Sequence, residues 1–181
     1  DSFGLLAFFK AVGFRPSRDV DLVWDVARFP FAARPQPVLV RDAERADVAA
    51  VAAIDGEVLG ERRGRYFDSK WQTASAHPEQ SRFLLAELDG DPAGYLVADL
   101  YRGEFGIEVT RGVIDTIGVR QRFQHRGVAS ALVQHLLRWL GQRGVTQLET
   151  LCRWDDWELL PFFEYVGFRP SARLNLEWRL N

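Results

Sequence analysis

The stretch between residues 113 and 132 holds the residues best suited to chemistry. An apolar run ends at Val119, a polar loop with three arginines follows, and helical periodicity begins at Gly127. N–H groups at a helix start lack intrahelical acceptors and lie at the positive end of the helix dipole, so such a turn can bind a pyrophosphate. Gly127 lets a ligand approach the backbone, and Arg120, Arg122 and Arg126 add positive charge. A plain helix start without a ligand is the alternative.

The sequence offers little for metal or thiol chemistry. Cys152 is the only cysteine. An internal disulfide and a multi-cysteine metal site are therefore excluded. We expect no bound metal and, because a lone cysteine fits a reducing compartment, a cytoplasmic location.

Periodicity places the polar loop in a mixed pattern of strands and helices. Strands are predicted at Val38–Arg41, Phe83–Glu87, Ala93–Ala98, Glu108–Val119 and Thr146–Leu151. Helices are predicted at Ala43–Leu59, Arg62–Ser75, Gly127–Leu140 and Asp155–Tyr165. Asp42 is the expected N-cap of the first helix. Gly118, inside an apolar strand, predicts a β-bulge.

The two ends of the chain share a repeated sequence. Leu5 to Trp24 aligns with Leu159 to Trp178 at an offset of 154 residues, and twelve of the twenty positions are identical. Each copy predicts a helix closed by a glycine, then an Arg-Pro step and an alternating strand. We therefore divide the chain into a helix–strand unit at 1–29, a proline-rich linker at 30–37, and a main domain at 38–181.

Length and charge limit the class of partner. With 181 residues the chain can bury one sizeable core, and its formal net charge is −2. Nothing in these totals predicts binding to nucleic acid or to an anionic membrane. No apolar run approaches the roughly 20 residues of a membrane helix. A small molecule or a peptide is the expected partner.

One motif gives the pattern a family resemblance. Gln124, Gly127 and Ala129 fit the (Arg/Gln)-x-x-Gly-x-(Gly/Ala) signature, so residues 113–132 resemble motif A of the GNAT acyltransferase superfamily. The order of elements from Val38 onward and the Phe-Phe-Glu-Tyr-Val-Gly-Phe ending at Phe168 extend the resemblance over about four-fifths of the chain. It implies an α+β fold whose mixed sheet splays between its fourth and fifth strands. It also implies an N-acyltransferase that moves an acetyl or other short acyl group from acyl-CoA to a primary amine by direct attack on the thioester.

The resemblance implies site residues as well. Acetyl-CoA, the expected co-substrate, is assigned to Ile117, Gly118, Val119, Gln124, His125, Arg126, Gly127, Val128, Ala129, Ser130, Asp156 and Phe163. Asp115 is the first candidate for the general base that accepts the proton of the amine, and Glu149 is the second.

Two departures from the family pattern keep alternatives open. Phe163 stands where the family usually has a tyrosine as general acid, and Tyr165 is roughly 200° away around the helix. The chain could therefore be a non-catalytic acyl-CoA-binding module.

Only thirteen residues follow Phe168, enough for one strand where relatives have two. We interpret the N-terminal unit as a remnant of a tandem GNAT protein. We expect it to pack beside the C-terminal unit, either as an intrachain pseudo-dimer or within a homodimer.

Overall fold

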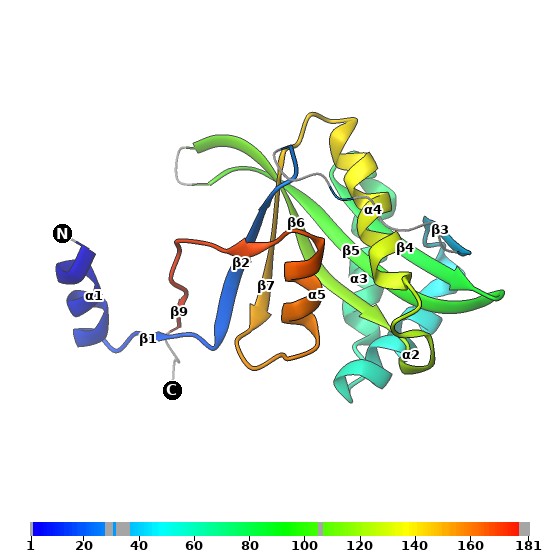
Figure 1. Ribbon diagram of the computed structural model, residues 1–181, viewed down its shortest axis with the longest axis horizontal. Helices are drawn as coiled ribbons and strands as arrows, with labels where there is room; N and C mark the ends of the chain where they lie inside the picture. The colour runs from blue at the N-terminus through cyan, green and yellow to red at the C-terminus, as the bar shows by residue number, and fades with distance from the viewer. Residues whose placement is uncertain (1, 28–30, 32–36, 105–106, 178–181) are drawn as a thin grey trace.

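A computed structural model describes residues 2–27, 31, 37–104 and 107–177, in which helices cover both faces of a seven-stranded sheet (Figure 1). The strands lie in the order β3-β4-β5-β6-β7-β2-β8. Their bounds are β2 Asp19–Asp25, β3 Val38–Asp42, β4 Ser81–Leu88, β5 Asp91–Glu104, β6 Ile107–Val119, β7 Gln147–Arg153 and β8 Arg169–Pro170. The helices are α1 Ser2–Ala11, α2 Val48–Leu59, α3 Gly64–Ala76, α4 Val128–Gly141 and α5 Leu159–Val166. The predicted α+β class is confirmed.

Alternation along the strands divides the core into two layers. On β4, Leu84 and Ala86 face the cluster formed with α4 and α5, whereas Phe83 and Leu85 face the cluster formed with α2 and α3. All four side chains are buried. The continuous apolar run Phe83–Ala86 is thus explained by helices on both faces of the sheet.

The sheet opens where β6 meets β7. These two strands run parallel and pair only over Gly112–Ile114 and Leu148–Thr150, whereas the other pairs of the sheet are antiparallel. The Thr150 hydroxyl donates to the Ile114 carbonyl oxygen over 3.0 Å at the last paired position. Beyond this point the strands separate, as expected.

The expected bulge lies elsewhere. In the β5–β6 ladder, Val97 pairs with Thr116 and Ala98 with Ile114, so Asp115 is the extra residue. Gly118 is paired regularly with Tyr95, and the bulge predicted there is wrong. A Cβ at Gly118 would lie 2.6 Å from the Tyr95 ring, so the glycine permits close packing.

The helix predicted from Ala43 begins later, and its cap is Asp47. Asp42 ends β3, so its predicted capping role is wrong. A 3₁₀ turn, η1 (Arg45–Asp47), intervenes, and the Asp47 carboxylate accepts the Glu44 N–H over 2.7 Å. The last helix also starts late, at Leu159.

The repeated units exchange strands. β2 of the N-terminal unit lies between β7 and β8, and Leu22 pairs with Pro170 of the C-terminal unit. Pro16 of β1 (Arg15–Pro16) pairs in turn with Leu176 of β9 (Leu176–Glu177). Adding the repeat offset to Pro16 and Leu22 gives Pro170 and Leu176, so the two pairings are equivalent. Each unit therefore gives its second strand to the other.

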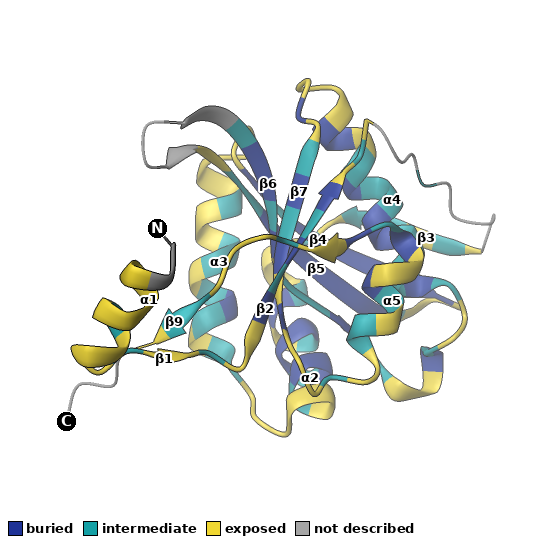
Figure 2. Cartoon of the chain, turned by 60° about the vertical axis from the view of Figure 1, so that its left-hand side comes forward, coloured by how far each residue is buried: buried dark blue, intermediate teal, exposed yellow. Residues whose placement is uncertain are grey.

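Helix α1 is far more exposed than its repeat, α5. Leu5 and Phe8 are each 58% exposed, whereas Phe163 and Val166 of α5 are buried. Figure 2 shows α1 projecting from the body of the molecule beside β1 and β9.

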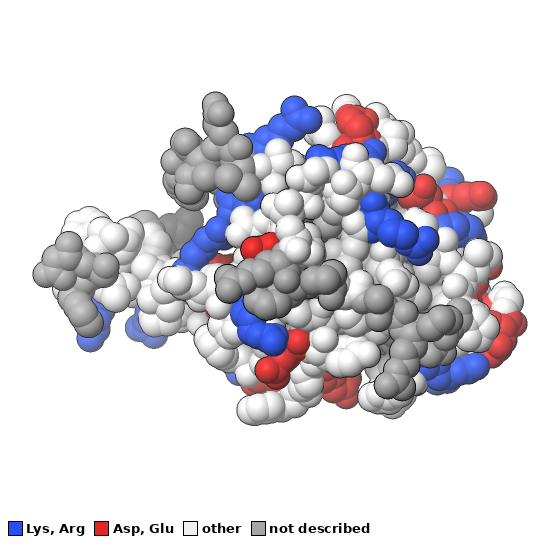
Figure 3. Space-filling model, turned by 45° about the horizontal axis from the view of Figure 1, so that its top comes forward, with Lys and Arg blue, Asp and Glu red and all other residues white. Residues whose placement is uncertain are grey.

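No described helix is long and apolar enough to cross a membrane. Basic and acidic side chains are interspersed over the face drawn in Figure 3.

Candidate active site

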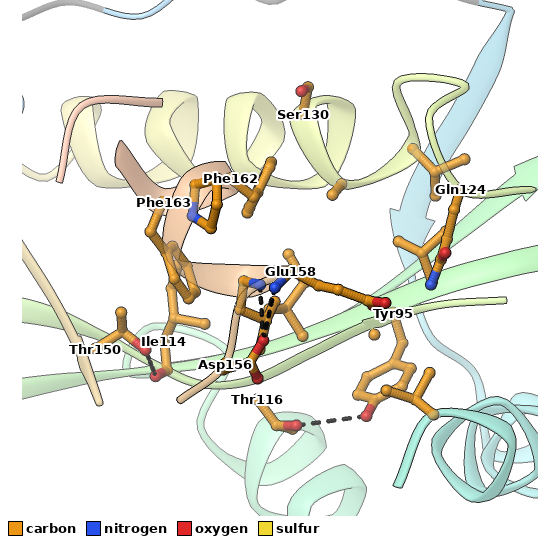
Figure 4. A pocket seen from close by; sticks show the side chains of 18 of the residues that line it. Tyr95, Ile114, Thr116, Gln124, Ser130, Thr150, Asp156, Glu158, Phe162 and Phe163 are labelled. Atoms are coloured by element: carbon orange, nitrogen blue, oxygen red, sulfur yellow. Dashed lines mark hydrogen bonds between the residues drawn. The ribbon is translucent and has the colours of Figure 1, made fainter. Parts of the chain in front are cut away.

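A cleft of about 640 Å³ lies at the opening between β6 and β7. The end of β6, the start of α4 and the start of α5 line it. In Figure 4, Phe162 and Phe163 stand on one side and Gln124 and Tyr95 on the other. Every residue assigned to the coenzyme from the sequence lines this cleft except Arg126.

The start of α4 has the geometry of an anion-binding turn. Gly127, with φ of 80°, is the N-cap, and His125 also has a positive φ of 58°. Ala131 N–H donates to the Gly127 carbonyl over 2.9 Å. In an α-helix the N–H groups before this bond lack intrahelical acceptors, so Val128, Ala129 and Ser130 present them at the cleft.

Two arginines of the loop, Arg122 and Arg126, form ion pairs with surface aspartates. Arg122 contacts Asp91 and Arg126 contacts Asp89, each at 2.9 Å, at the β4–β5 turn. All four side chains are about half exposed. Such surface ion pairs contribute only about 0–1 kcal/mol, so a phosphate could compete for either arginine.

Asp115 lies where the strands separate and is held by two side chains of α3. The Tyr66 hydroxyl donates to its carboxylate, and Lys70 Nζ lies 2.9 Å from it. Lys70 also contacts Asp99 at 3.0 Å. Burial opposes the charge of Lys70, but the two carboxylates raise its pKa overall, so it remains a cation. Sequence reasoning missed both partners, because their spacing of four residues places them on one helix face without indicating which carboxylate that face meets.

Glu149 is enclosed by two arginines. Its carboxylate accepts hydrogen bonds from Arg111 at 3.0 Å and from Arg173 at 2.9 Å. Burial alone would raise the pKa of Glu149, but the two arginines lower it overall. A carboxylate held as an anion in this way is a weak proton acceptor.

A buried polar network supports the floor of the cleft. Asp55 of α2 is fully buried and forms two hydrogen bonds with Arg63, at 2.8 and 2.7 Å. The Tyr95 hydroxyl donates to the same carboxylate over 2.5 Å. Arg63 and Tyr95 also reach the Thr116 hydroxyl of the cleft, each at 3.4 Å. Burial, followed by the Asp55 charge, raises the pKa of Tyr95 well above its usual range, so the hydroxyl stays a donor.

The wall formed by α5 is mainly apolar. Phe163, 2% exposed, lines the cleft, whereas Tyr165 is 65% exposed and is absent from the lining. Asp156 lines the cleft, and its carboxylate accepts the Leu159 N–H over 2.8 Å, which caps α5 (Figure 4). Trp157, 79% exposed, extends the wall outward. Burial raises the pKa of the Cys152 thiol to about 11, which makes it a poor nucleophile.

A second pocket of about 530 Å³ adjoins the cleft. The residues that the two cavities share are Ile114, Asp115, Thr150 and Leu151. These residues lie where β6 separates from β7, so Asp115 borders both cavities. Among the described residues no group of three or more His, Cys, Asp or Glu side chains could hold a metal.

Comparison with known proteins assigns the fold. Residues 50–168 match the acetyltransferase (GNAT) family. The aminoglycoside antibiotic 6'-N-acetyltransferase of Acinetobacter baumannii superposes with a TM-score of 0.66 at 18% identity, over 80% of this chain and 98% of that one. The ribosomal-protein-alanine N-acetyltransferase of Brucella melitensis biovar Abortus gives 0.64 at 16% identity, over 80% and 99%. A tandem GNAT protein from the clavulanic acid biosynthesis pathway gives 0.70 at 16% identity, over 96% of this chain but only 57% of that one.

The chain therefore belongs to the GNAT acetyltransferase family. At these identities the similar structures show the fold alone. The tandem protein differs from the other two in matching the N-terminal unit as well, since 96% of this chain is covered.

Proposed function

We propose that this protein transfers an acetyl, or another short acyl, group from acyl-CoA to a primary amine. The cleft carries the proposal. Its free N–H groups at the start of α4 suit a pyrophosphate, and its apolar wall at Ile117, Val119 and Phe163 suits a pantetheine arm. The adjoining pocket gives the amine a separate approach, which meets the cleft at Asp115.

Bound acetyl-CoA would supply an activated thioester, so the protein must mainly position a neutral amine. A lysine-like ammonium has a pKa of about 10.4 and must lose its proton before attack. We assign this proton to Asp115, directly or through water, because Asp115 borders both cavities. Attack by the amine nitrogen forms the amide N–C bond and breaks the thioester C–S bond. With Phe163 in place of the usual tyrosine, water or another side chain must protonate the departing thiolate.

Glu149 is the weaker candidate for the base. Arg111 and Arg173 both hold its carboxylate, and it borders only the second pocket. Its geometry favours a role in shaping that pocket.

The first test is release of free thiol from acetyl-CoA with a panel of amines, together with coenzyme A binding by calorimetry. Gly127→Glu places a carboxylate at the phosphate turn and is expected to abolish coenzyme binding. Gly144→Glu is the matched control, because Gly144 also has a positive φ, of 66°, and open space around it. Unchanged affinity in Gly127→Glu would rule out the site. Coenzyme binding without thiol release from any amine would favour the non-catalytic module.

The second test concerns the base. Asp115→Asn should lower the turnover rate at neutral pH by roughly 10²-fold or more and leave coenzyme binding nearly intact. A larger effect of Glu149→Gln would reverse the assignment. Equal, small effects of both variants would assign the proton to solvent.

We also propose the domain division given above, with a helix–strand unit at 1–29 and an acyltransferase domain at 38–181. The linker at 30–37 lies outside the described residues except for Phe31 and Pro37. The exposed apolar face of α1 favours a second candidate, in which the chain is one half of a tandem GNAT protein. The mass of the protein purified from its native cells distinguishes one half from the whole. The cytoplasmic location, the identity of the amine, and the lack of nucleic-acid and membrane partners stay predictions.

A further inference from the structure

The second pocket contains charged groups of two kinds. Glu149 is neutralised by Arg111 and Arg173, and Asp115 is held by Tyr66 and Lys70. The two arginines neutralise Glu149, whereas Asp115 shares the one Lys70 cation with Asp99 and keeps negative charge for the amine.

Two other polar side chains in this pocket are unpartnered. Among the described residues, the Asp21 carboxylate has no hydrogen-bond or ion-pair partner. The Asn175 amide nitrogen is buried and also lacks a partner. A buried donor without an acceptor is unfavourable, so a ligand oxygen that reaches the Asn175 amide would supply the acceptor that it lacks.

Asp21 and Asn175 occupy the same position of the repeated unit, because the repeat offset of 154 residues separates them. Their backbones are held alike. The Ser171 N–H donates to the Asp21 carbonyl over 2.8 Å, and the Ser17 N–H donates to the Asn175 carbonyl over 2.9 Å. The strand exchange thus brings an acid from one copy and an amide from the other to one pocket.

The position of Asp21 relative to Asp115 sets the kind of ligand. Asp21 is opposite Leu151 in the β2–β7 ladder, and β7 is the neighbour of β6, which carries Asp115. Asp115 and Leu151 follow the last β6–β7 pair, where the two strands separate, so the backbones of Asp21 and Asp115 are at least two strand spacings, or about 10 Å, apart. An amine that reacts beside Asp115 can therefore extend a second cationic group toward Asp21.

We propose that Asp21 and Asn175 recognise the acceptor, and that they select a small amine carrying a second ammonium group. Asp21 pairs with that ammonium group, and Asn175 donates to a neighbouring oxygen where the acceptor has one. This inference rests on the proposed acyltransferase function. It gives the N-terminal unit a role in the site besides its role in the sheet.

The test compares α,ω-diaminoalkanes with monoamines of the same chain length. Asp21→Asn should raise the KM for the diamines roughly tenfold, with kcat nearly unchanged, and should leave the monoamines unaffected. Asp19→Asn is the control, because Asp19 is exposed on the same strand and lies outside the pocket. Combining Asp21→Asn with Asn175→Asp moves the charge to the equivalent position and should restore part of the affinity.

The outcomes separate this inference from the proposed function. Equal effects of Asp21→Asn on both amine classes, or no effect on either, would overturn the recognition role. If the wild-type chain releases no thiol with any amine, the acyltransferase proposal fails. In that case, calorimetry of the coenzyme-loaded chain with a diamine still decides the recognition role. Diamine binding weakened by Asp21→Asn supports it, and unaltered or undetectable binding refutes it.

Discussion

Replacement of Trp24 by alanine measures how far the N-terminal strand belongs to the core. The Trp24 side chain is 1% exposed and contacts the ring of Phe168 at a centroid distance of 5.5 Å. A Cβ at Gly167 would lie 2.7 Å from the indole, so the two copies are closely packed here. Truncation of a buried tryptophan costs about 3–5 kcal/mol. This is a large part of the 5–15 kcal/mol typical of a folded domain.

Urea unfolding followed by far-UV circular dichroism gives the measurement, because it does not depend on tryptophan fluorescence. With a slope of about 2 kcal/mol per molar, the Trp24→Ala midpoint should fall by roughly 2 M. Trp154→Ala is the matched control, since Trp154 is 57% exposed, and should change stability by under about 0.5 kcal/mol. Equal midpoints for the two variants would show that β2 lies loosely on the surface and would refute this reasoning.

Three further predictions concern the site. Gly118→Ala forces the Tyr95 ring away, so it should lower the free energy of unfolding by about 1–3 kcal/mol and weaken coenzyme binding. Gly141→Ala is the control, because the space around Gly141 is open and neither quantity should change. Equal melting curves and coenzyme affinities for the two variants would contradict the prediction. Asp55→Ala removes the carboxylate that pairs with Arg63 and accepts from the Tyr95 hydroxyl, and it should cost about 3–5 kcal/mol in chemical unfolding. Asp68→Ala at the exposed Arg45 pair should cost under about 1 kcal/mol. Glu149→Gln should lower the free energy of unfolding at pH 7. Because the folded-state pKa of Glu149 is below its ordinary value of 4.5, the difference from wild type should shrink as the pH falls below that value, and a difference that is constant down to pH 3 would contradict the ion-pair assignment.

The sequence predicted the parts of the site that depend on neighbours along the chain. A strand, a polar loop and a helix start form one continuous segment around Gly127, so the signal for the turn is local. The partners of Asp115 come instead from α3, far earlier in the chain, and no local pattern links Tyr66 or Lys70 to that carboxylate. The bulge was misplaced for a similar reason. Gly118 packs against the Tyr95 ring on the neighbouring strand, and the sequence of a single strand does not predict that contact.

The sequence showed that the helix–strand unit is repeated, but it did not show which strands of the two units pair with each other. Two units that share twelve of twenty positions can each fold on themselves or exchange strands, and the local contacts are similar in both arrangements. The reciprocal registers, with Pro16 opposite Leu176 and Pro170 opposite Leu22, show which arrangement the chain adopts.

The strand exchange also imposes an order on folding. Leu22 of β2 pairs with Thr150 of β7, so β2 leaves the ribosome long before the strand that it pairs with. Until β7 is made, the apolar face of Val20, Leu22 and Trp24 has no ladder to join. Such non-local pairing slows folding and leaves apolar surface open to aggregation. A nascent chain stalled before β7 should therefore be a substrate for chaperones, and the N-terminal unit should be the last part of the sheet to gain protection from hydrogen exchange.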